Sequence, residues 1–272
     1  MNGSIFINPV ILEQTYLPRL LPHREEQHKY LAECIKPLFQ RRAGTNLLVV
    51  GSSGIGKTAC VKYVFRKLIE ETDNIMPFYV NCWKRDTTPK IVKEMANMLG
   101  IKLIEKMSSD EIFDILIKKL SKFDGVAFGF DEIDRVQDYD FLYRILEDVP
   151  LKTIFLVTNV TEWLAKVDRR LMSRLMLERL EFKPYSFIET RDILYERQKH
   201  AFAPDSWIYD AFEKVIRKAF EIKDIRVGLF LMRRAGEVAN NRNSGKIEIK
   251  DVDKALEKLK DFYGKQDIGS FI

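Results

Sequence analysis

Short apolar runs alternate along the chain with longer segments in which apolar residues recur every three or four positions. Five runs have the length of buried strands, and they span residues 46–50, 78–81, 126–130, 153–157 and 177–182. Between two of them, Ile112, Leu116 and Leu120 share one face of a helix that begins near Ser108 or Ser109. Because strands that alternate with helices form parallel sheets covered on both faces, the pattern predicts an α/β fold.

The strand pattern stops after Tyr185, and the remaining chain is predicted to be helical. Helical periodicity runs through residues 188–201, 208–220, 225–241 and 249–262. We therefore expect three parts. The predicted boundaries give an α/β domain with a five-stranded parallel sheet at 1–184, a helical domain that would form a lid at 185–263 and a loose tail at 264–272.

Composition places the chain among ordinary soluble globular proteins, with 46% hydrophobic and 31% charged residues. No apolar run approaches the ~20 residues of a membrane-spanning helix, and the N-terminus lacks a signal-peptide pattern. We therefore expect a soluble cytoplasmic protein without a membrane partner. Cys34, Cys60 and Cys82 are widely spaced, which favours reduced core residues over a zinc site. The net charge of +5 permits a polyanionic partner without requiring one.

The most informative motif is a phosphate-binding loop directly after the first predicted strand. Residues 51–58 fit the Walker A pattern G-x-x-x-x-G-K-[ST] at every fixed position. The glycines let backbone N–H groups turn inward, and the positive end of the next helix adds to their attraction for phosphates. We expect Lys57 to reach the terminal phosphates and the Thr58 hydroxyl to bind Mg²⁺. The predicted nucleotide contacts are Gly51, Ser52, Ser53, Gly54, Ile55, Gly56, Lys57, Thr58 and Ala59.

An acidic pair, Asp131 and Glu132, follows the third predicted strand. Ligands of open α/β sheets bind outside the carboxyl ends of the strands, where these side chains are expected. We predict that Asp131 holds Mg²⁺ through its water shell and that Glu132 polarises the attacking water as a general base. Such a pair alone is a weak signal, since helix caps often show the same acidic pattern. Downstream of a phosphate loop, it is typical of the Walker B motif.

Three polar residues have both a catalytic and a structural interpretation. Asn159 follows the fourth strand, where it either positions the attacking water (sensor 1) or begins a turn. Arg174, with Arg170 as the second choice, either reaches a neighbouring subunit's nucleotide as an arginine finger or lies on a solvated helix face. Arg226 begins a helix, where it either senses the γ-phosphate (sensor 2) and couples nucleotide state to domain closure, or is a surface arginine. We favour the catalytic interpretation of Asn159, Arg174 and Arg226.

Taken in order, these motifs resemble those of the AAA+ ATPases, and in detail those of archaeal initiators of the origin-recognition and Cdc type. Residues 21–25, Leu-Pro-His-Arg-Glu, look like that family's P-H-R-E box, which packs near the adenine. The resemblance therefore implies that His23 and Arg24 contact the nucleotide. Phe-Lys-Pro-Tyr at 182–185 is similar to the start of the family's lid, and Arg-Ala-Gly-Glu-Val-Ala at 234–239 to a lid helix.

The resemblance implies a nucleotide-controlled DNA replication initiator or helicase-loading factor that hydrolyses ATP slowly, with ATP, ADP and Mg²⁺ as ligands. Members of the family usually continue into a winged-helix domain that binds origin DNA, and this chain ends where that domain would begin. We expect either a shortened protein or a naturally short member. The alternative that stays open is a nucleotide-locked adaptor for another protein, without origin-specific DNA binding.

The family also carries a helical insertion after its second strand that touches DNA, and residues 83–93 occupy that place. The basic residues there either meet the phosphates of duplex DNA or form a solvated charged face. They are Lys84, Arg85, Lys90 and Lys93. Trp83 is expected to lie in the core rather than to serve as a stacking platform for bases. Further partners implied by the resemblance are replication proteins or a second AAA+ subunit.

Overall fold

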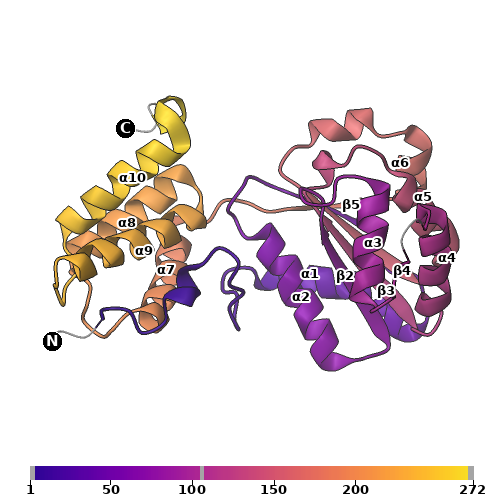
Figure 1. Cartoon of the computed structure of the whole chain (residues 1–272), viewed down its shortest axis with the longest axis horizontal. Coiled ribbons are helices and arrows are strands. Elements are labelled where there is room, and N and C mark those ends of the chain that lie inside the picture. Colours follow the sequence, from indigo (N-terminus) through magenta and orange to yellow (C-terminus); the bar gives the residue numbers. More distant parts are fainter. Residues whose placement is uncertain (1–3, 105–106, 269–272) are drawn as a thin grey trace. The chain divides into compact units, whose positions relative to one another are not determined.

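The computed structural model describes residues 4–104 and 107–268, without the side chains of residues 166 and 260–268. It divides the chain into two compact units (Figure 1). The sheet unit consists of Arg24–Ser52 and Gly56–Phe182. The helical unit consists of Met1–His23, Ser53–Ile55 and Lys183–Ile272, so it includes the tip of the phosphate loop. Each unit has its own hydrophobic core.

A five-stranded parallel sheet forms the centre of the sheet unit, in the order β2-β3-β4-β1-β5. The strands are β1 (Leu47–Val50), β2 (Ile75–Asn81), β3 (Gly125–Asp131), β4 (Lys152–Thr158) and β5 (Glu178–Glu181). In register, Val50 pairs with Thr158, and Asp131 pairs with Val157. The residues that follow β1, β3 and β4 therefore emerge at one edge of the sheet. The predicted α/β fold with a parallel sheet is confirmed.

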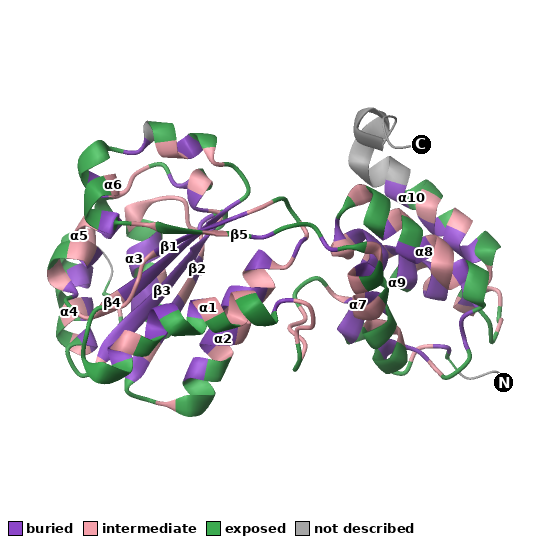
Figure 2. Ribbon diagram, turned by 180° about the vertical axis from the view of Figure 1, so that it is seen from behind, coloured by how far each residue is buried: buried purple, intermediate pink, exposed green. Residues whose placement is uncertain are grey.

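Helices cover both faces of this sheet (Figure 1). They are α1 (Glu25–Ile35), α2 (Lys57–Glu71), α3 (Thr88–Met98), α4 (Ser109–Leu120), α5 (Asp140–Asp148) and α6 (Arg169–Leu175). Alternate strand residues point to opposite faces. Phe128 and Phe130 pack into the core that α3–α6 share, whereas Phe155 stacks on Phe65 of α2 at 5.9 Å. Strands β1 to β4 are thus largely buried, as Figure 2 shows.

The edge strand β5 differs from the prediction of five buried strands. Glu178, Arg179 and Glu181 are exposed, and only one neighbour, β1, pairs with this strand. Charged residues on an open edge discourage pairing with another chain. The apolar residues that flank this strand had made it look like the interior ones.

Four helices form the helical unit: α7 (Phe187–Ala201), α8 (Tyr209–Ile222), α9 (Ile225–Asn241) and α10 (Ile249–Ile268). Their inner faces meet in one core, which includes Leu194, Val215, Leu231 and Val252. Figure 2 shows the buried residues along α8 and α9. The predicted helices match these bounds within a few residues, except that α10 runs to Ile268 and so covers part of the predicted tail at 264–272. Residues 269–272 lie outside the described part of the chain.

The N-terminal segment corrects the predicted domain boundary, which assigned residues 1–184 to the sheet domain. Ile5, Ile11 and Leu12 are buried in the core of the helical unit. Arg197 of α7 donates a hydrogen bond to the Ile11 carbonyl at 3.2 Å, and the Phe6 and Phe202 rings lie 4.9 Å apart. Three aliphatic side chains thus complete a small core that four helices leave open.

Candidate functional site

The predicted phosphate loop lies between β1 and α2, with a backbone that curls as the motif requires. Gly54 (φ 72°) and Gly56 (φ 94°) adopt left-handed conformations, in which a residue with a side chain would be strained. Gly56 is also the residue that caps the first turn of α2, which begins at Lys57. The N–H groups of a helix start and a curled loop attract anions. The backbone therefore fits a chain of phosphates.

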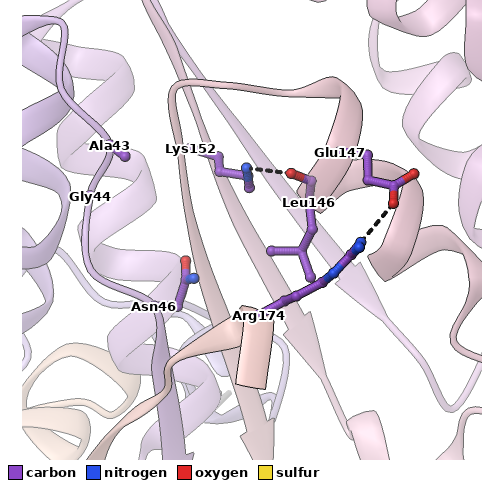
Figure 3. Close-up of a pocket in the computed structure, with 7 residues that line it drawn as sticks. All are labelled: Ala43, Gly44, Asn46, Leu146, Glu147, Lys152 and Arg174. Carbon is purple, nitrogen blue, oxygen red and sulfur yellow. Dashed lines mark hydrogen bonds and ion pairs between the residues drawn. The ribbon is translucent and has the colours of Figure 1, made fainter. Parts of the chain in front are cut away.

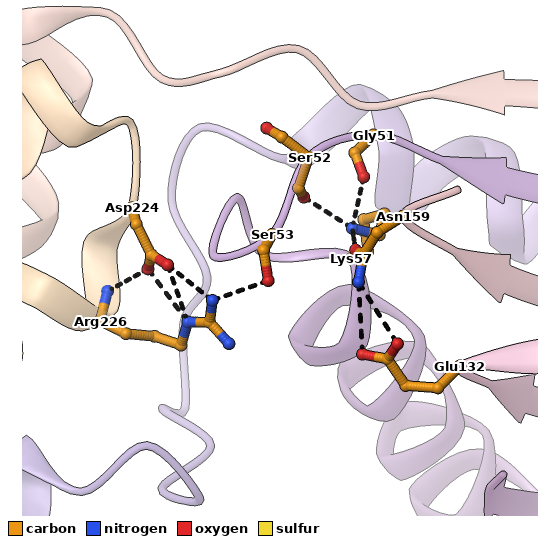
Figure 4. Close-up of polar contacts among 8 residues, drawn as sticks. All are labelled: Gly51, Ser52, Ser53, Lys57, Glu132, Asn159, Asp224 and Arg226. Atoms are coloured by element: carbon orange, nitrogen blue, oxygen red, sulfur yellow. Dashed lines mark hydrogen bonds and ion pairs between the residues drawn. The ribbon is translucent and has the colours of Figure 1, made fainter. Parts of the chain in front are cut away.

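The side chain of Lys57 is held at the base of this loop (Figure 4). Lys57 is only 6% exposed, and its ammonium donates to the carbonyls of Gly51 at 2.8 Å and Ser52 at 2.7 Å. It also donates to Asn159 Oδ1, at the end of β4. A buried ammonium that neutral oxygens surround can still attract an anion strongly, because little water screens its charge.

Asp131, at the end of β3, accepts hydrogen bonds from two hydroxyl groups. Thr58 Oγ1 and Tyr79 OH each donate to Asp131 Oδ2 at 2.6 Å, and the Glu132 N–H donates to Oδ1 at 3.0 Å. Asp131 is 3% exposed, so these bonds fix its orientation. A carboxylate beside a hydroxyl oxygen is the donor set that Mg²⁺ prefers. The predicted metal-binding pair, Thr58 and Asp131, therefore lies together and fits that ion.

Tyr79 is the residue of this cluster that the sequence prediction missed. It lies on β2, two residues before Asn81, which pairs with Asp131 in the register. Burial and the Asp131 charge raise the pKa of Tyr79, so its hydroxyl stays protonated as a donor. A phenol on a predicted strand was an available signal, since a hydroxyl that folding removes from water requires a partner.

Glu132 and Asn159 face each other beside Lys57. Asn159 Nδ2 lies 3.4 Å from Glu132 Oε1 and 3.3 Å from Oε2, while its oxygen accepts from Lys57 (Figure 4). Burial raises the pKa of Glu132, the charges of Asp131 and Asp134 raise it further, and Lys57 and Asn159 oppose the shift. The amide of Asn159 thus orients a carboxylate whose proton affinity is increased. This arrangement can polarise a water molecule.

Arg226 lies at the start of α9 and contacts the phosphate-loop tip that belongs to the same unit. Its guanidinium pairs with Asp224 at 2.6 Å and donates to Ser53 Oγ at 2.7 Å (Figure 4). Asp224 also caps the helix by accepting from the Arg226 N–H at 2.8 Å. A Cβ at Gly54 would approach Asp224 Oδ1 to 1.9 Å, so only glycine fits there. Arg226 is therefore oriented by one carboxylate toward the loop.

His23 and Arg24 make separate contacts, although they are neighbours in sequence. His23 Nε2 lies 3.3 Å from Asp192 Oδ2 of α7, within the helical unit. Arg24, in the sheet unit, is 4% exposed, and its guanidinium carbon lies 5.3 Å from the centre of the Phe182 ring. Arg24 thus packs on an aromatic ring inside the sheet unit, and its contact with a nucleotide stays a prediction.

Arg174 does not lie with Lys57 and Asp131. It lines a pocket where β1 and β4 begin, with its guanidinium on Glu147 at 2.6 Å, near Lys152 (Figure 3). Arg170 is exposed in the first turn of the same helix. A parallel sheet separates the start of its strands from the edge where they end. Arg174 is therefore placed away from its own chain's phosphate loop, and both predicted interpretations stay open.

The segment after β2 corrects one expectation and leaves another open. Trp83 is 62% exposed, so the prediction of a core position was wrong. The preceding Cys82 fills the buried position, and Asn81 Oδ1 accepts from the Trp83 N–H at 3.0 Å in a turn that directs Trp83 outward. Arg85 pairs with Glu94 at 3.0 Å and Lys90 with Asp86 at 2.6 Å. Lys84 and Lys93 are exposed.

Across the described residues, no helix has both the length and the apolar character needed to cross a membrane.

Comparison with protein families gives two matches, one for each unit. An AAA domain matches residues 40–163, and a Cdc6 AAA+ ATPase-type lid domain matches residues 191–257. The ORC1-type DNA replication protein 1 of Sulfurisphaera tokodaii is 34% identical over 267 residues, which cover 93% of this chain and 67% of that protein. The corresponding protein of Aeropyrum pernix is 31% identical over 264 residues, which cover 91% and 67%.

Solved structures agree with this assignment. The structure of the Aeropyrum pernix ORC1 protein in complex with DNA has a TM-score of 0.85 at 30% identity, covering 96% of this chain and 71% of that one. Cdc6p from Pyrobaculum aerophilum, with a TM-score of 0.81 at 20% identity, supports the fold. The sheet order, the helical lid and the sequence identity to these relatives all indicate the same family. The chain belongs to the family of ORC1-type DNA replication proteins, within the AAA+ ATPases.

Proposed function

We propose that this chain is a replication initiator whose hold on DNA and on replication proteins is controlled by bound ATP, which it hydrolyses slowly. Its family supports the role in initiation. The observation that carries the nucleotide control is one connected network, in which Lys57 contacts Asn159 and Asn159 contacts Glu132. A protein that only held a nucleotide as a structural ligand would need no acid beside the phosphate loop to polarise water.

In this proposal the loop backbone from Gly51 to Gly56 and the Lys57 ammonium bind the phosphates. Thr58 and Asp131 bind Mg²⁺, directly and through its water shell, with Tyr79 holding the carboxylate in place. Magnesium, when bound, neutralises phosphate charge and favours attack at the terminal phosphate. Arg226 meets that phosphate from the loop tip, and Arg24 and His23 contact the adenine.

Glu132 accepts the proton of the attacking water. Asn159 orients both the Glu132 carboxylate and this water. Because the carboxylate is half-buried and its pKa is raised, it holds a proton more tightly than an ordinary glutamate does. That property suits a general base near neutral pH. The 3.3 Å contact with Asn159 is long for a hydrogen bond, which leaves room for the amide to shift toward a water.

DNA contact comes to this proposal from a relative, the Aeropyrum pernix ORC1 protein, whose structure was solved in complex with DNA. On this chain, Lys84 and Lys93 are exposed after β2, while the nearby Arg85 and Lys90 are engaged with acidic partners. Contacts from these cations to phosphates would position the protein without reading sequence.

Nucleotide binding by a Lys57→Ala variant tests the proposal most directly. We expect affinity for a fluorescent ATP analogue to fall by at least a hundredfold, because a buried ammonium is lost beside the phosphates. Lys67→Ala is the matched control, since Lys67 lies exposed on the same helix and pairs with Glu70. Unchanged affinity in Lys57→Ala would remove the nucleotide site from this loop.

A further inference from the structure

Trp83 and Arg135 form an exposed stack beside the carboxyl end of β2. The Arg135 guanidinium carbon lies 4.3 Å from the centre of the Trp83 indole. The indole remains 62% exposed, and the Arg135 side chain is 50% exposed. An exposed indole offers a flat apolar surface on which another planar group can stack. Since the guanidinium covers one face of the ring, the second face is available to another planar group.

Hydrogen bonds fix the two loops that carry this stack, Cys82–Thr87 and Ile133–Asp138. The Gln137 N–H donates to the Asp86 carbonyl at 2.8 Å, and the Gln137 amide donates to the Asp86 carboxylate at 2.8 Å. The Thr88 N–H donates to Asp138 at 3.1 Å. An exposed aromatic ring that is already ordered loses little conformational entropy when a ligand stacks on it.

Positive charge gathers next to the indole. Lys84 is exposed and follows Trp83 directly. Burial lowers the pKa of Lys62 on α2, the charge of Asp131 raises it, and the charge of Lys84 lowers it. Asp86 and Asp134 are acidic, but Asp86 is bound by Lys90 and Gln137, and Asp134 accepts from Thr158 and pairs with Arg135.

We propose that the Trp83–Arg135 stack binds one unpaired base of single-stranded DNA, while Lys84 meets an adjacent phosphate. Aromatic rings beside cations are the usual means of holding single strands without sequence preference, because every base has a π face. Bases in a closed duplex are stacked on one another and offer no face to the indole. The inference rests on the DNA binding in the proposed function and specifies the state of the DNA at this surface.

Tryptophan fluorescence provides a direct readout, because the chain has three tryptophans and the other two are buried. Trp163 is 5% exposed and Trp207 is 9% exposed. Titration with an oligothymidylate of about 16 nucleotides should quench the emission of Trp83 as a base stacks on it. In parallel, fluorescence anisotropy of the labelled oligonucleotide and of a duplex of the same length should be measured for each variant.

Trp83→Ala should weaken binding of the oligothymidylate on the order of 10- to 100-fold and leave duplex affinity unchanged. Trp83→Phe should recover part of the loss, since a smaller ring still stacks. Lys84→Ala should flatten the salt dependence by about 0.7 in the slope of log K against log salt. Tyr209→Ala is the matched control, because Tyr209 is 78% exposed but lies on the helical unit.

The proposal is overturned if Trp83→Ala binds the oligothymidylate as tightly as the unmodified protein, or if no single strand binds at all. It is also overturned if Trp83→Ala weakens duplex and single strand equally. ATP binding measured on the same preparations distinguishes a failure of this inference from a failure of the proposed function. Retained ATP and duplex binding without single-strand stacking would refute this inference alone, whereas lost ATP binding in the unmodified protein would refute the proposed function.

Discussion

At the scale of single residues, Asp131 shows how neighbours orient a carboxylate, which we propose as a ligand of Mg²⁺. Both hydroxyl donors, from Thr58 and Tyr79, reach the same oxygen, and the backbone of Glu132 occupies the other. If Thr58 turned its oxygen toward a bound Mg²⁺, Tyr79 would still hold the carboxylate. Groups that orient the ligands of a metal ion typically change its affinity 10- to 100-fold.

Tyr79→Phe should therefore weaken Mg²⁺ binding about 10-fold, because the ring stays packed while the hydroxyl is lost. The measurement is a Mg²⁺ titration of the affinity for a fluorescent ATP analogue, with affinity in EDTA as the metal-free reference. Tyr63→Phe is the control, since Tyr63 lies on α2 and stacks on His28 rather than contacting Asp131. The same Mg²⁺ midpoint in Tyr79→Phe and the unmodified protein would contradict the role of Tyr79.

Glu132 gives a prediction about pH. The base must be ionised to act, and its pKa is raised, so ATP hydrolysis should fall with acidification at a higher pH than an ordinary glutamate would give. Asn159 opposes that shift, so Asn159→Ala should move the acid limb of the pH–rate profile to still higher pH. Glu132→Gln should bind ATP normally and lose 10²- to 10⁴-fold in turnover. Hydrolysis that persists in Glu132→Gln would exclude this residue as the base.

The sequence predicted most of these residues because each follows a strand, and the register brings the ends of parallel strands together. Trp83 was placed wrongly for a local reason. An aromatic residue beside an apolar run looks like the run's continuation, and the turn at Asn81 that directs it outward depends on side-chain hydrogen bonds. Tyr79 was missed because its partner, Asp131, lies on a different strand.

At the scale of elements, periodicity predicted α9 with its observed bounds, Ile225–Asn241, and placed the four strands β1 to β4. The N-terminal segment could not be found in this way. Ile5, Ile11 and Leu12 follow neither a helical nor a strand period, and one of the contacts that fix the segment, from Arg197 to Ile11, joins residues 186 positions apart. The role of these three side chains, which is to pack in the core of the helical unit, is visible only in the folded structure.

Leu12→Ala tests that structural role. Leu12 is 3% exposed, so removing its side chain leaves a cavity and should destabilise the helical unit by about 2–4 kcal/mol. Hydrogen exchange of amides in α7–α9 should accelerate, while amides of β1, β3 and β4 should keep their protection. Val10→Ala is the control, since Val10 is 52% exposed in the same segment. Equal exchange in both variants would mean that the segment only covers the surface.

At the scale of the whole molecule, the distance between Arg174 and the phosphate loop of its own chain becomes an argument about assembly. Arg174 rests on Glu147 in a pocket where β1 and β4 begin, whereas Lys57 and Asp131 lie where β1 and β3 end. An arginine that assists hydrolysis from this position must act on a second copy of the chain. The contribution of Arg174 to ATP hydrolysis would then depend on protein concentration. A surface ion pair would make no contribution that depends on concentration.

ATPase activity per molecule should therefore rise with protein concentration, with and without duplex DNA, and Arg174→Ala should abolish the rise while ATP still binds. Arg169→Ala is the control, since Arg169 is exposed on the same helix. Mixing Glu132→Gln with Arg174→Ala should restore part of the activity, because some pairs then combine Glu132 of one chain with Arg174 of the other. If turnover does not depend on concentration, or if the mixture stays inactive, Arg174 only forms a structural ion pair with Glu147.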